Sequence, residues 1–439
     1  MGPQSEYTHV QFLGFNLLTI PGHDVDGCSH PETGLEGCYL GSEDIQQDVE
    51  RRIEIMTTAM QSAYAEWKRN KLVVEAASEP QVKTLKLFVV PEFFWRGSRG
   101  VYSFEEVWDG TLPIVDRLRE AAADSKFEDW LFFFGTIVMS KPTKGWFGSS
   151  ELAYKNVMPI MKGGPEGKTW LVEKHTISSI DFIKVDPAFG VRKPCGVGRC
   201  SVESQEFNEQ FDLETTKVLA TAGIRVVKDN VFEVDGLLVG VEICLDHNRG
   251  TEVFGSRTAL EQKIDELKTT VDVQVIASAG MSIEWGPVAV TRDGPVFMAD
   301  GFGKTEVSFN RYGLGLEDWH NDPTAFIQVD VLSTNIYHQY ATWIQVSALG
   351  NGWRQLLKGT FPTAAYDAAT EIATVLNRAA ARDGLPGGEM LTFPTIDVYS
   401  PTPVQARRVA AVQPETFVRT LPPPRSARAL RVGGDFFSM

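Results

Sequence analysis

The sequence predicts an α/β fold built of stacked layers. Its apolar runs are short and rich in branched or aromatic residues, as strands of a buried sheet are. Segments whose apolar residues recur at helical spacing lie between several of these runs, and this alternation favours a layered α/β architecture. With 439 residues, the chain could hold two domains or one large unit with extensions.

The N-terminal part is expected to contain two strands and two helices. Residues 10–20 form the first apolar run, and a polar stretch with glycines and cysteines follows at 21–41. A long helix is expected over about 43–71, because apolar residues recur there at near-helical spacing. Residues 85–94 indicate a buried strand that ends at a Pro-Glu break, and 104–123 indicate a second helix.

The middle of the chain is expected to form a strand, a hairpin and an irregular insertion. Residues 130–139 are strongly apolar and indicate the strand. Residues 153–161 and 170–174 are joined by the turn KGGPEGK, which is typical of a hairpin. Residues 182–208 show no periodicity and contain the sequence KPCGVGRC, so we expect an irregular segment there.

A second hairpin is expected near the cysteine discussed below. Its strands would be residues 225–234 and 237–244, joined by an Asp-Gly turn, which is a strong hairpin signal. Beyond it we expect a helix over 252–268 and a buried strand over 271–279. Further expected elements are strands at 306–309 and 325–331, a helix at 364–382, and little structure beyond about 415.

Cys244 is the first candidate for chemistry. It ends the apolar strand GLLVGVEIC and precedes the sequence LDHNRG. A nucleophile on a sharp turn between a strand and a helix is held rigidly, and nearby backbone N–H groups stabilise a thiolate or an oxyanion. The alternative is an inert cysteine buried at the end of a core strand.

Glu92 and Lys174 have chemically complementary positions. Glu92 follows an apolar strand and lies among aromatic residues, where poor solvation raises the pKa of a carboxyl and makes it a better base near neutrality. Lys174 ends the run TWLVEK and could donate to a developing oxyanion. Each could also be an ordinary strand-end residue. Because the carboxyl ends of strands line the site in α/β sheets, the coincidence of all three favours one site.

These motifs resemble those of the nitrilase superfamily of carbon–nitrogen hydrolases, in its amidase-like branch. That family uses a Glu, a Lys and a Cys in this chain order, and the matching pieces here are VVPEFF, EKHTIS and VGVEICLDHNRG. The resemblance covers roughly residues 9 to 310. It implies a four-layer αββα sandwich, with Glu92 as general base, Cys244 as nucleophile, Lys174 stabilising the tetrahedral intermediate and the backbone N–H of Leu245 completing the oxyanion hole.

The resemblance also implies a domain organisation and a reaction. The core would span 1–310, a C-terminal extension packing on the core or on a partner subunit would span 311–415, and a Pro/Arg-rich tail would span 416–439. The reaction would be hydrolysis of a non-peptide carbon–nitrogen bond through a Cys thioester, without metal or organic cofactor. Many nitrile-cleaving members carry Trp-Glu directly after the Cys, whereas this chain has Leu245 and Asp246, which favours an amide over a nitrile.

Departures from the family pattern concern the second carboxylate and the loops. Many members carry a Glu seven or eight residues after the Lys, and here Asp181 stands at that place. The separation from Lys174 to Cys244 is 244 − 174 = 70 residues, which is long for the family. The excess lies in the irregular segment with Cys195 and Cys200, so the sequence does not reveal the substrate.

Pocket and metal candidates are weaker. Trp95, His247, Met281 and Trp285 follow catalytic or core strands and are expected to line the substrate pocket, with core packing as the alternative. His23, Cys28, His30 and Cys38 share one loop, but their spacing fits no standard zinc site, so we expect no metal.

Other activities remain open at this point. The same thioester could be intercepted by an amine, which would make the chain an acyltransferase, or the fold could serve as a non-catalytic scaffold. A net charge of −15 disfavours nucleic-acid binding, and no apolar run is long enough to span a membrane. Five cysteines without a disulfide pattern and the lack of a signal-peptide pattern indicate a cytoplasmic protein. The family resemblance implies a homodimer or larger homo-oligomer.

Overall fold

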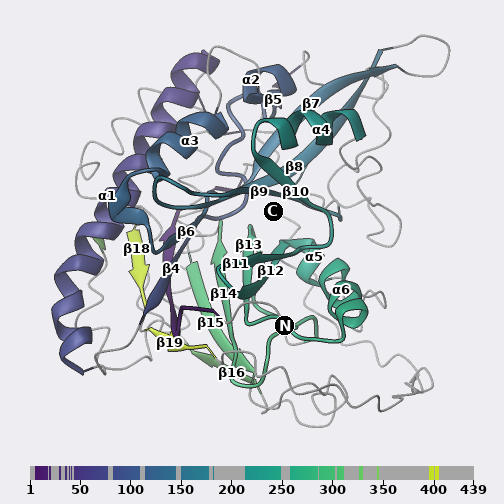
Figure 1. Ribbon diagram of the computed structural model, residues 1–439. Coiled ribbons are helices and arrows are strands. Elements are labelled where there is room, and N and C mark those ends of the chain that lie inside the picture. The colour runs from purple at the N-terminus through teal and green to yellow at the C-terminus, as the bar shows by residue number, and fades with distance from the viewer. Residues whose placement is uncertain are drawn as a thin grey trace, which may run out of the picture.

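The computed structural model shows a mixed α/β fold in which two β-sheets lie face to face (Figure 1). This confirms the α/β class predicted from the sequence. The residues that the structure describes are 5–17, 19–20, 29–30, 35–36, 39, 41, 44–77, 83–108, 114–144, 150–176, 181, 213–248, 258–284, 286–301, 304–310, 326–329, 344–345, 395–399 and 401–404.

The larger sheet has eleven strands in the described residues, and its main path runs β10-β9-β8-β6-β4-β1-β18-β17. In this path β1, β4 and β6 are parallel neighbours, whereas β8 and β9 form an antiparallel hairpin. The strands are β1 (His9–Asn16), β4 (Thr84–Val89), β5 (Tyr102–Ser103), β6 (Trp130–Phe133), β7 (Ile137–Lys144), β8 (Ser150–Lys162), β9 (Thr169–Glu173), β10 (Ile224–Val227), β17 (Ile344–Gln345), β18 (Thr395–Val398) and β19 (Thr402–Pro403).

The smaller sheet has six strands among the described residues, in the order β11-β12-β13-β14-β15-β16. The pairs β12–β13 and β13–β14 are parallel, and the other neighbouring pairs are antiparallel. The strands are β11 (Val231–Val234), β12 (Leu237–Ile243), β13 (Val273–Ser278), β14 (Pro295–Asp300), β15 (Lys304–Asn310) and β16 (Phe326–Val329). A separate two-stranded pair joins β2 (Ser29–His30) to β3 (Leu35–Glu36).

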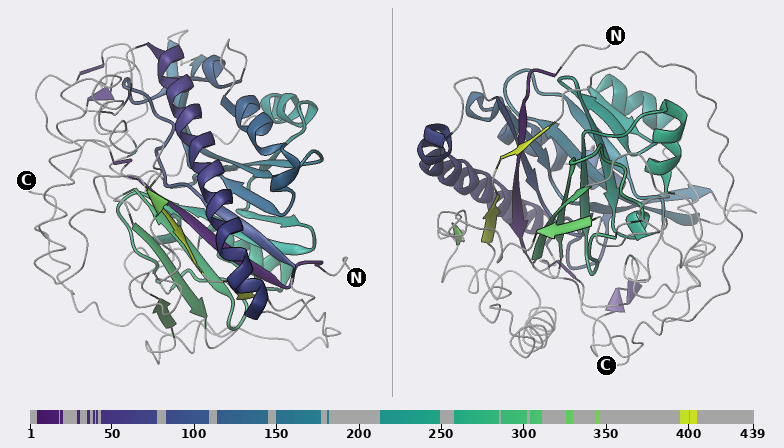
Figure 2. Two further views of the ribbon diagram at one scale, coloured as in Figure 1. Left: turned by 90° about the vertical axis from the view of Figure 1, so that its left-hand side faces the viewer. Right: turned by 90° about the horizontal axis from the view of Figure 1, so that it is seen from below.

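Helices flank the sheets in the described parts of the chain. The long helix α1 runs along the larger sheet, and α6 lies by the smaller sheet (Figure 2). The helices are α1 (Ile45–Ala77), α2 (Phe104–Trp108), α3 (Ile114–Ala122), a short 3-10 turn (Ser125–Phe127), α4 (Leu213–Thr221), α5 (Leu245–Asn248) and α6 (Ala259–Leu267).

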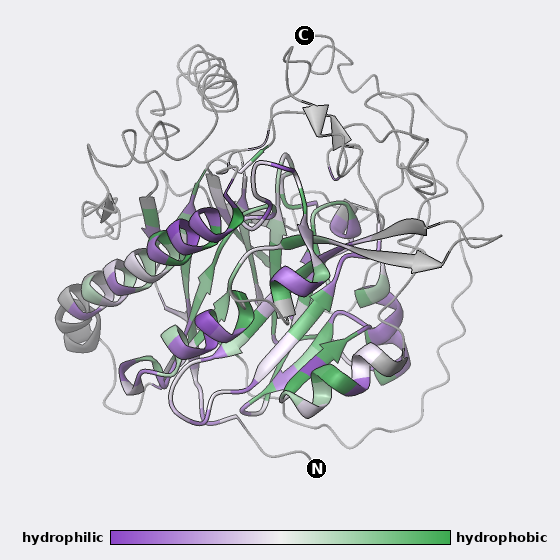
Figure 3. Ribbon diagram, turned by 90° about the horizontal axis from the view of Figure 1, so that it is seen from above, coloured by the Kyte–Doolittle hydropathy of each residue, from purple (hydrophilic) through white to green (hydrophobic). Residues whose placement is uncertain are grey.

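Three hydrophobic clusters hold these elements together. The strands alternate their side chains between faces, so Leu87 of β4 packs between the sheets while Phe88 packs toward the helices. The cluster between the sheets joins β1, β4, β6, β8 and β9 to β11–β15. A second cluster joins the larger sheet to α1 and α3, and a third joins β12–β14 to α6. The apolar strands and the more polar outer helices are visible in the hydropathy colouring of Figure 3.

The sheets approach closely where β1 crosses β15. A Cβ atom placed on Gly14 would lie 2.3 Å from Cγ2 of Thr305, so no larger residue fits there without movement. Close contact at this point brings the carboxyl end of β4 in the larger sheet next to those of β12 and β13 in the smaller sheet. The backbone N–H of Glu92 accordingly reaches the Ser278 carbonyl at 3.3 Å.

Both hairpins predicted from the sequence are confirmed. Strands β8 and β9 pair antiparallel, and so do β11 and β12. Three single elements expected from the sequence prove to be two each. The apolar run at 130–139 is interrupted between β6 and β7 by Gly135, whose φ is +72°. The expected helix at 104–123 corresponds to two described helices, α2 and α3.

The third expected element, a strand, is also divided in two, and this changes how the chain connects the two sheets. The expected strand at 225–234 is broken at Asn230, whose φ is +57°. As a result β10 joins the larger sheet and β11 the smaller one, so the chain passes from one sheet to the other at this residue. The strands β14 and β18 and the helix α4 were not predicted. The expected helix at 364–382 and the insertion at 182–208 lie outside the described residues.

Residues beyond 310 contribute strands to both sheets. Strand β16 pairs with β15, and β18 pairs antiparallel with β1, matching Leu13 to Val398. Among the helices that the structure describes, none combines the length and the apolar content that crossing a bilayer requires.

Candidate active site

Cys244 lies at the end of β12 in a strained backbone conformation. Its φ is +47°, a left-handed value that costs energy for any residue with a Cβ and persists only where the surroundings enforce it. Its N–H donates to the Ala277 carbonyl at 2.9 Å, and its own carbonyl accepts the N–H of His247 at 2.8 Å. The side chain is buried. The thiol is therefore held at a sharp turn between a strand and the short helix α5.

Glu92 lies on a similarly tight turn after β4. The next residue, Phe93, has a φ of +64°, and its N–H donates to Thr136 Oγ1 at 2.9 Å. The Glu92 carbonyl accepts the Thr19 hydroxyl at 2.5 Å. The Glu92 side chain is wholly buried. These bonds fix the carboxylate at the end of β4, at the junction of the two sheets.

Lys174 joins the carboxylates of Glu92 and Asp181. Its Nζ lies 2.8 Å from Glu92 Oε1, and 2.9 and 2.7 Å from the two carboxylate oxygens of Asp181. All three side chains are fully buried. A buried ammonium can persist only when it is paired and hydrogen-bonded in this way. The structure thus brings together the Glu, the Lys and the second carboxylate named from the sequence.

Asn156 completes this cluster and was not singled out in the sequence. It lies on β8, and its Nδ2 donates to Glu92 Oε1 at 2.9 Å and to Asp181 Oδ1 at 2.8 Å. Its backbone carbonyl accepts the N–H of Lys174 at 2.9 Å. A polar residue directly before the apolar run VMPIM was the one available signal, and it is weak by itself.

The charges of the cluster shift the ionisation of its members. Burial raises the pKa of Glu92 to about 7, an effect that Lys174 reduces and Asp181 reinforces. Burial acts to lower the pKa of Lys174, but Asp181 and Glu92 outweigh it and raise this pKa, so the lysine stays protonated. Burial and the Glu92 charge raise the pKa of the Cys244 thiol well above its usual value. Near neutrality the site therefore contains a neutral thiol, a carboxyl that can take its proton and a fixed ammonium.

Arg96 is a second buried cation that the sequence did not reveal. Its guanidinium donates to the carbonyl of Asp181, and its Nε donates to the Gly100 carbonyl at 2.9 Å. The guanidinium carbon lies 4.4 Å from the ring centroid of Tyr39 and 4.7 Å from that of Phe93. Arg96 thereby ties the Glu92 turn to the loop of Asp181 and Lys174.

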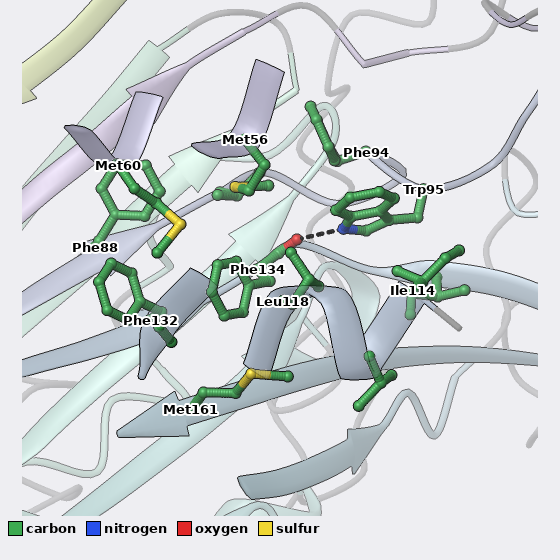
Figure 4. Close-up of a cluster of buried hydrophobic side chains, with 14 of the residues drawn as sticks. Met56, Met60, Phe88, Phe94, Trp95, Ile114, Leu118, Phe132, Phe134 and Met161 are labelled. Carbon is green, nitrogen blue, oxygen red and sulfur yellow. Dashed lines mark hydrogen bonds between the residues drawn. The ribbon is translucent and has the colours of Figure 1, made fainter. Parts of the chain in front are cut away.

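Trp95 packs in the hydrophobic core, which is the alternative that the sequence left open beside a position in the pocket wall. The positive φ at Phe93 turns the chain, and the Trp95 indole enters the cluster between the larger sheet and the helices. Its Nε1 donates to the Phe134 carbonyl at 2.8 Å, as Figure 4 shows. Neighbours in that cluster include Phe94, Ile114 and Leu118 (Figure 4).

The other residues expected near the substrate lie in different surroundings from Trp95 and from one another. His247 is buried; its Nδ1 lies 2.6 Å from Glu242 Oε2, and its Nε2 accepts the N–H of Glu284 at 3.0 Å. Met281 is partly buried and packs against the cluster that contains Cys244. Leu245 begins α5 directly after Cys244. Trp285 lies outside the described residues.

The loop cysteines cannot be placed beside this site. Cys195, Cys200, His23, Cys28 and Cys38 lie outside the described residues, and His30 belongs to β2. In the parts of the chain that the structure describes, no group of three or more His, Cys, Asp or Glu side chains is arranged to hold a metal ion.

Comparison with known proteins gives matches among solved structures. The chain is similar to solved amidases of the nitrilase superfamily. A cysteine-to-serine variant of the Nesterenkonia AN1 amidase matches with a TM-score of 0.28 and 10% identity, over 67% of this chain and 77% of that chain. Another structure of that amidase, described as the NitN amidase, matches with a TM-score of 0.28 and 10% identity, over 79% of this chain and 100% of that one.

A glutamine-dependent NAD+ synthetase from Acinetobacter baumannii matches with a TM-score of 0.22 and 14% identity, over 62% of this chain and 32% of that one. No family model and no curated protein matches the chain. TM-scores this low do not establish an activity, so the function proposed next is based on the geometry of the site.

Proposed function

We propose that this protein is a carbon–nitrogen hydrolase of the nitrilase type that cleaves a non-peptide amide through a Cys thioester. The observation that supports this most strongly is the buried contact of 2.8 Å between Lys174 Nζ and Glu92 Oε1, in a cluster that also shifts the pKa of Cys244. A structural ion pair has no need of a cysteine in a strained conformation beside it. Nucleophilic catalysis requires such a cysteine together with a base and an oxyanion donor.

The first half of the reaction follows from these groups. Glu92 takes the thiol proton while the Cys244 sulfur attacks the amide carbon, and the carbonyl π electrons move to the oxygen. The Lys174 ammonium and the backbone N–H of Leu245 would stabilise that oxyanion. When the carbonyl re-forms, the carbon–nitrogen bond breaks and the protonated Glu92 gives its proton to the nitrogen, so ammonia or an amine leaves.

The second half returns the enzyme to its starting state. Glu92 takes a proton from water, and the resulting nucleophile attacks the thioester. The carbon–sulfur bond then breaks, and the sulfur regains its proton from Glu92. The sum is amide plus water to carboxylic acid plus ammonia or amine, so no oxidant, reductant or further reactant is needed. A carboxyl with a pKa of about 7 suits both roles, since it accepts and returns protons readily near neutrality.

The three clusters of buried residues are what a four-layer αββα sandwich requires, with helices on both outer faces of two packed sheets. We include that architecture in the proposal, together with a small-molecule amide as substrate and a homodimer or larger homo-oligomer as the functional assembly. An amide is favoured over a nitrile because Leu245 and Asp246 replace the Trp-Glu pair common after the Cys in nitrile-cleaving members.

The first experiment measures the reactivity of each cysteine. The native protein is alkylated with limiting iodoacetamide across pH, and the rate at each of the five cysteines is obtained by peptide mass spectrometry. The Glu92→Gln variant is treated in parallel. We expect Cys244 to react much faster than the other four in the wild type and to lose that advantage in the variant. If Cys244 reacts no faster than Cys195 or Cys200 in the intact fold, the scaffold alternative is favoured.

A second experiment identifies the reaction. The wild type and a Cys244→Ser variant are screened for ammonia release from small aliphatic and aromatic amides, and from the matching nitriles. Hydroxylamine is added as a competing amine. Hydrolysis gives the free acid as the main product, whereas an acyltransferase gives mainly the hydroxamate while releasing the same amount of ammonia. Release of ammonia from nitriles but not from amides would contradict the amide proposal.

A further inference from the structure

Asn156 contacts all three charged members of the cluster. Its side-chain Nδ2 bonds to Glu92 and Asp181, and its backbone carbonyl holds the N–H of Lys174. The residue is on β8, where its neighbours Val157 and Met158 pack into the cores on opposite faces of the sheet, and it is 1% exposed. One uncharged side chain is thus interposed between two buried carboxylates.

The amide and the lysine donate to the same two oxygens. Glu92 Oε1 accepts Lys174 Nζ at 2.8 Å and Asn156 Nδ2 at 2.9 Å, and Asp181 Oδ1 accepts the same two groups at 2.9 and 2.8 Å. Two donors fill the ordinary accepting capacity of Glu92 Oε1. The other oxygen, Glu92 Oε2, is buried and accepts no such bond within the described residues.

The cysteine is the partner that remains for this second oxygen. The Cys244 thiol is close enough to the Glu92 carboxyl to lower the pKa of that carboxyl, although burial has the larger, opposite effect. Because Lys174 and Asn156 already donate to Oε1, Oε2 is the oxygen left to accept the thiol proton. The two oxygens of Glu92 therefore have separate roles, and the donors on Oε1 determine which oxygen faces the thiol.

The unused end of the Asn156 amide supports a role beyond packing. Its Oδ1 is buried and has no hydrogen-bond partner among the described residues, which destabilises the fold. Leucine has nearly the same shape and would avoid this cost. An apolar residue at this position could not supply the two N–H groups that Nδ2 donates. An aspartate there would add a third negative charge to the cluster.

We propose that Asn156 is a positioning residue of the hydrolase site: it fixes Glu92 through Oε1, so that Oε2 faces the Cys244 thiol, and does so without adding charge. This inference rests on the proposed function. It predicts that the loss of the two donors changes the pH dependence of Cys244, and not only the stability of the protein.

The test compares Asn156→Leu and Asn156→Asp with the wild type. Both variants keep the approximate shape of the side chain. The rate of Cys244 alkylation by iodoacetamide is measured from pH 5 to pH 10 by peptide mass spectrometry, and folding is checked by circular dichroism and thermal unfolding. For Asn156→Leu we expect a rate at least tenfold lower at pH 7 and a midpoint shifted upward, because a carboxylate that loses a donor is less easily ionised. For Asn156→Asp we expect an upward shift of one pH unit or more.

Asn310→Leu is the matched control. Asn310 is equally buried, and its Nδ2 donates to the Val290 carbonyl at 3.0 Å in the smaller sheet. Its replacement should lower thermal stability and leave the alkylation midpoint of Cys244 unchanged. If folded Asn156 variants keep the wild-type midpoint and rate, or if Asn310→Leu shifts the midpoint equally, Asn156 has only a structural role and the proposal is wrong.

Two further measurements keep the outcome decisive. The first is the NMR signal of the Asn156 side-chain amide in the wild type. Its chemical shift should change with pH at the same midpoint as Cys244 alkylation. An amide signal that does not change with pH would overturn the proposal even if neither variant folds. Glu92→Gln tests the proposed function separately. If Glu92→Gln alkylates Cys244 like the wild type, the hydrolase proposal itself fails, whatever the Asn156 variants do.

Discussion

The carboxylate of Asp246 accepts the backbone N–H of Thr176 at 2.7 Å, a bond that joins the two halves of the candidate site. Asp246 is the second residue after the proposed nucleophile Cys244, whereas Thr176 is the second residue after Lys174. The same carboxylate also accepts the N–H of His175 at 3.1 and 3.0 Å. Asp246 is buried, so these bonds are shielded from water. The loop that carries the ammonium is therefore anchored to the turn that carries the thiol.

We expect Asp246→Asn to impair the site more than the fold. An asparagine offers one accepting oxygen and a donor group that would face the N–H groups of His175 and Thr176, so the loop of Lys174 should loosen. A lost charge-assisted bond of this kind costs about 1–3 kcal/mol of unfolding free energy. Urea unfolding and Cys244 alkylation at pH 7 would measure the two effects, and the alkylation rate should fall at least tenfold.

Asp272→Asn provides the control for that variant. The buried carboxylate of Asp272 accepts the N–H of Leu238 at 2.7 Å in the smaller sheet. Its replacement should lower the unfolding free energy by a similar amount and leave the reactivity of Cys244 intact. An Asp246→Asn protein that alkylates at the wild-type rate would show that the bond to Thr176 does not position Lys174.

The pH dependence of Cys244 should follow Glu92 and not the thiol alone. Burial raises the pKa of Glu92 to about 7, and the carboxyl must be ionised to take the thiol proton. The rate of alkylation should therefore rise with pH to a midpoint near 7, below the usual thiol pKa of about 8.5. In Glu92→Gln that midpoint should disappear, and the remaining slow reaction should rise only in the alkaline range. A wild-type midpoint above 9 would argue against Glu92 as the base.

Three of the candidate site residues could be named from the sequence because each lies at the end of an apolar run, at a visible break. Glu92 follows a strand that ends at proline, Lys174 ends a hairpin strand, and Cys244 ends the strand after an Asp-Gly turn. Asp181 was named only through the family resemblance. These breaks are local features of the sequence, so the residues at them can be picked out from a single sequence without knowing the fold.

The sequence did not reveal the places in the site of Asn156, Arg96 and Asp246, because their hydrogen-bond partners are distant in the chain. Asn156 bonds to Glu92 across 64 positions, and Arg96 bonds to Asp181 across 85. The same limit explains the missed strand β18. Its four residues, TIDV, carry little periodic signal, and their pairing partner β1 lies at the opposite end of the sequence. The sequence left Trp95 open between a pocket wall and the core because it does not show the turn at Phe93, whose φ is +64°.

The position of β18 leads to a prediction about truncation. This strand pairs with β1, and the backbone N–H of the adjoining Tyr399 donates to the Phe12 carbonyl at 3.0 Å. A chain ending at residue 394 would lose Ile396 and Val398 from the core and expose the edge of β1. We expect that protein to aggregate or to unfold at a much lower temperature. A chain ending at 415 should keep the wild-type unfolding temperature, and equal stability of both truncated chains would contradict the role of β18.

Asp397 makes stability depend on pH. Its carboxyl lies between the sheets and accepts hydrogen bonds from Thr305 and Asn16. Burial raises its pKa from 3.8 to about 7, with both bonds acting in the opposite direction. Between these two values the folded protein retains a proton that the unfolded chain releases. Stability contributed by this group is therefore fully present below pH 3.8 and is lost as the pH rises to about 7.

We expect Asp397→Asn to remove this dependence, because an asparagine oxygen can accept from both Thr305 and Asn16 without ionising. Urea unfolding at several pH values would measure it. Below about pH 3.8 the two proteins should differ little, whereas at pH 8 the variant should be more stable, by about 1.4 kcal/mol for each pH unit by which folding raises the pKa of Asp397. Wild-type and variant curves that run parallel between pH 4 and pH 8 would show that Asp397 is ionised in the folded protein throughout this range. A variant that is less stable than the wild type at every pH would instead show that the carboxylate itself holds the two sheets together.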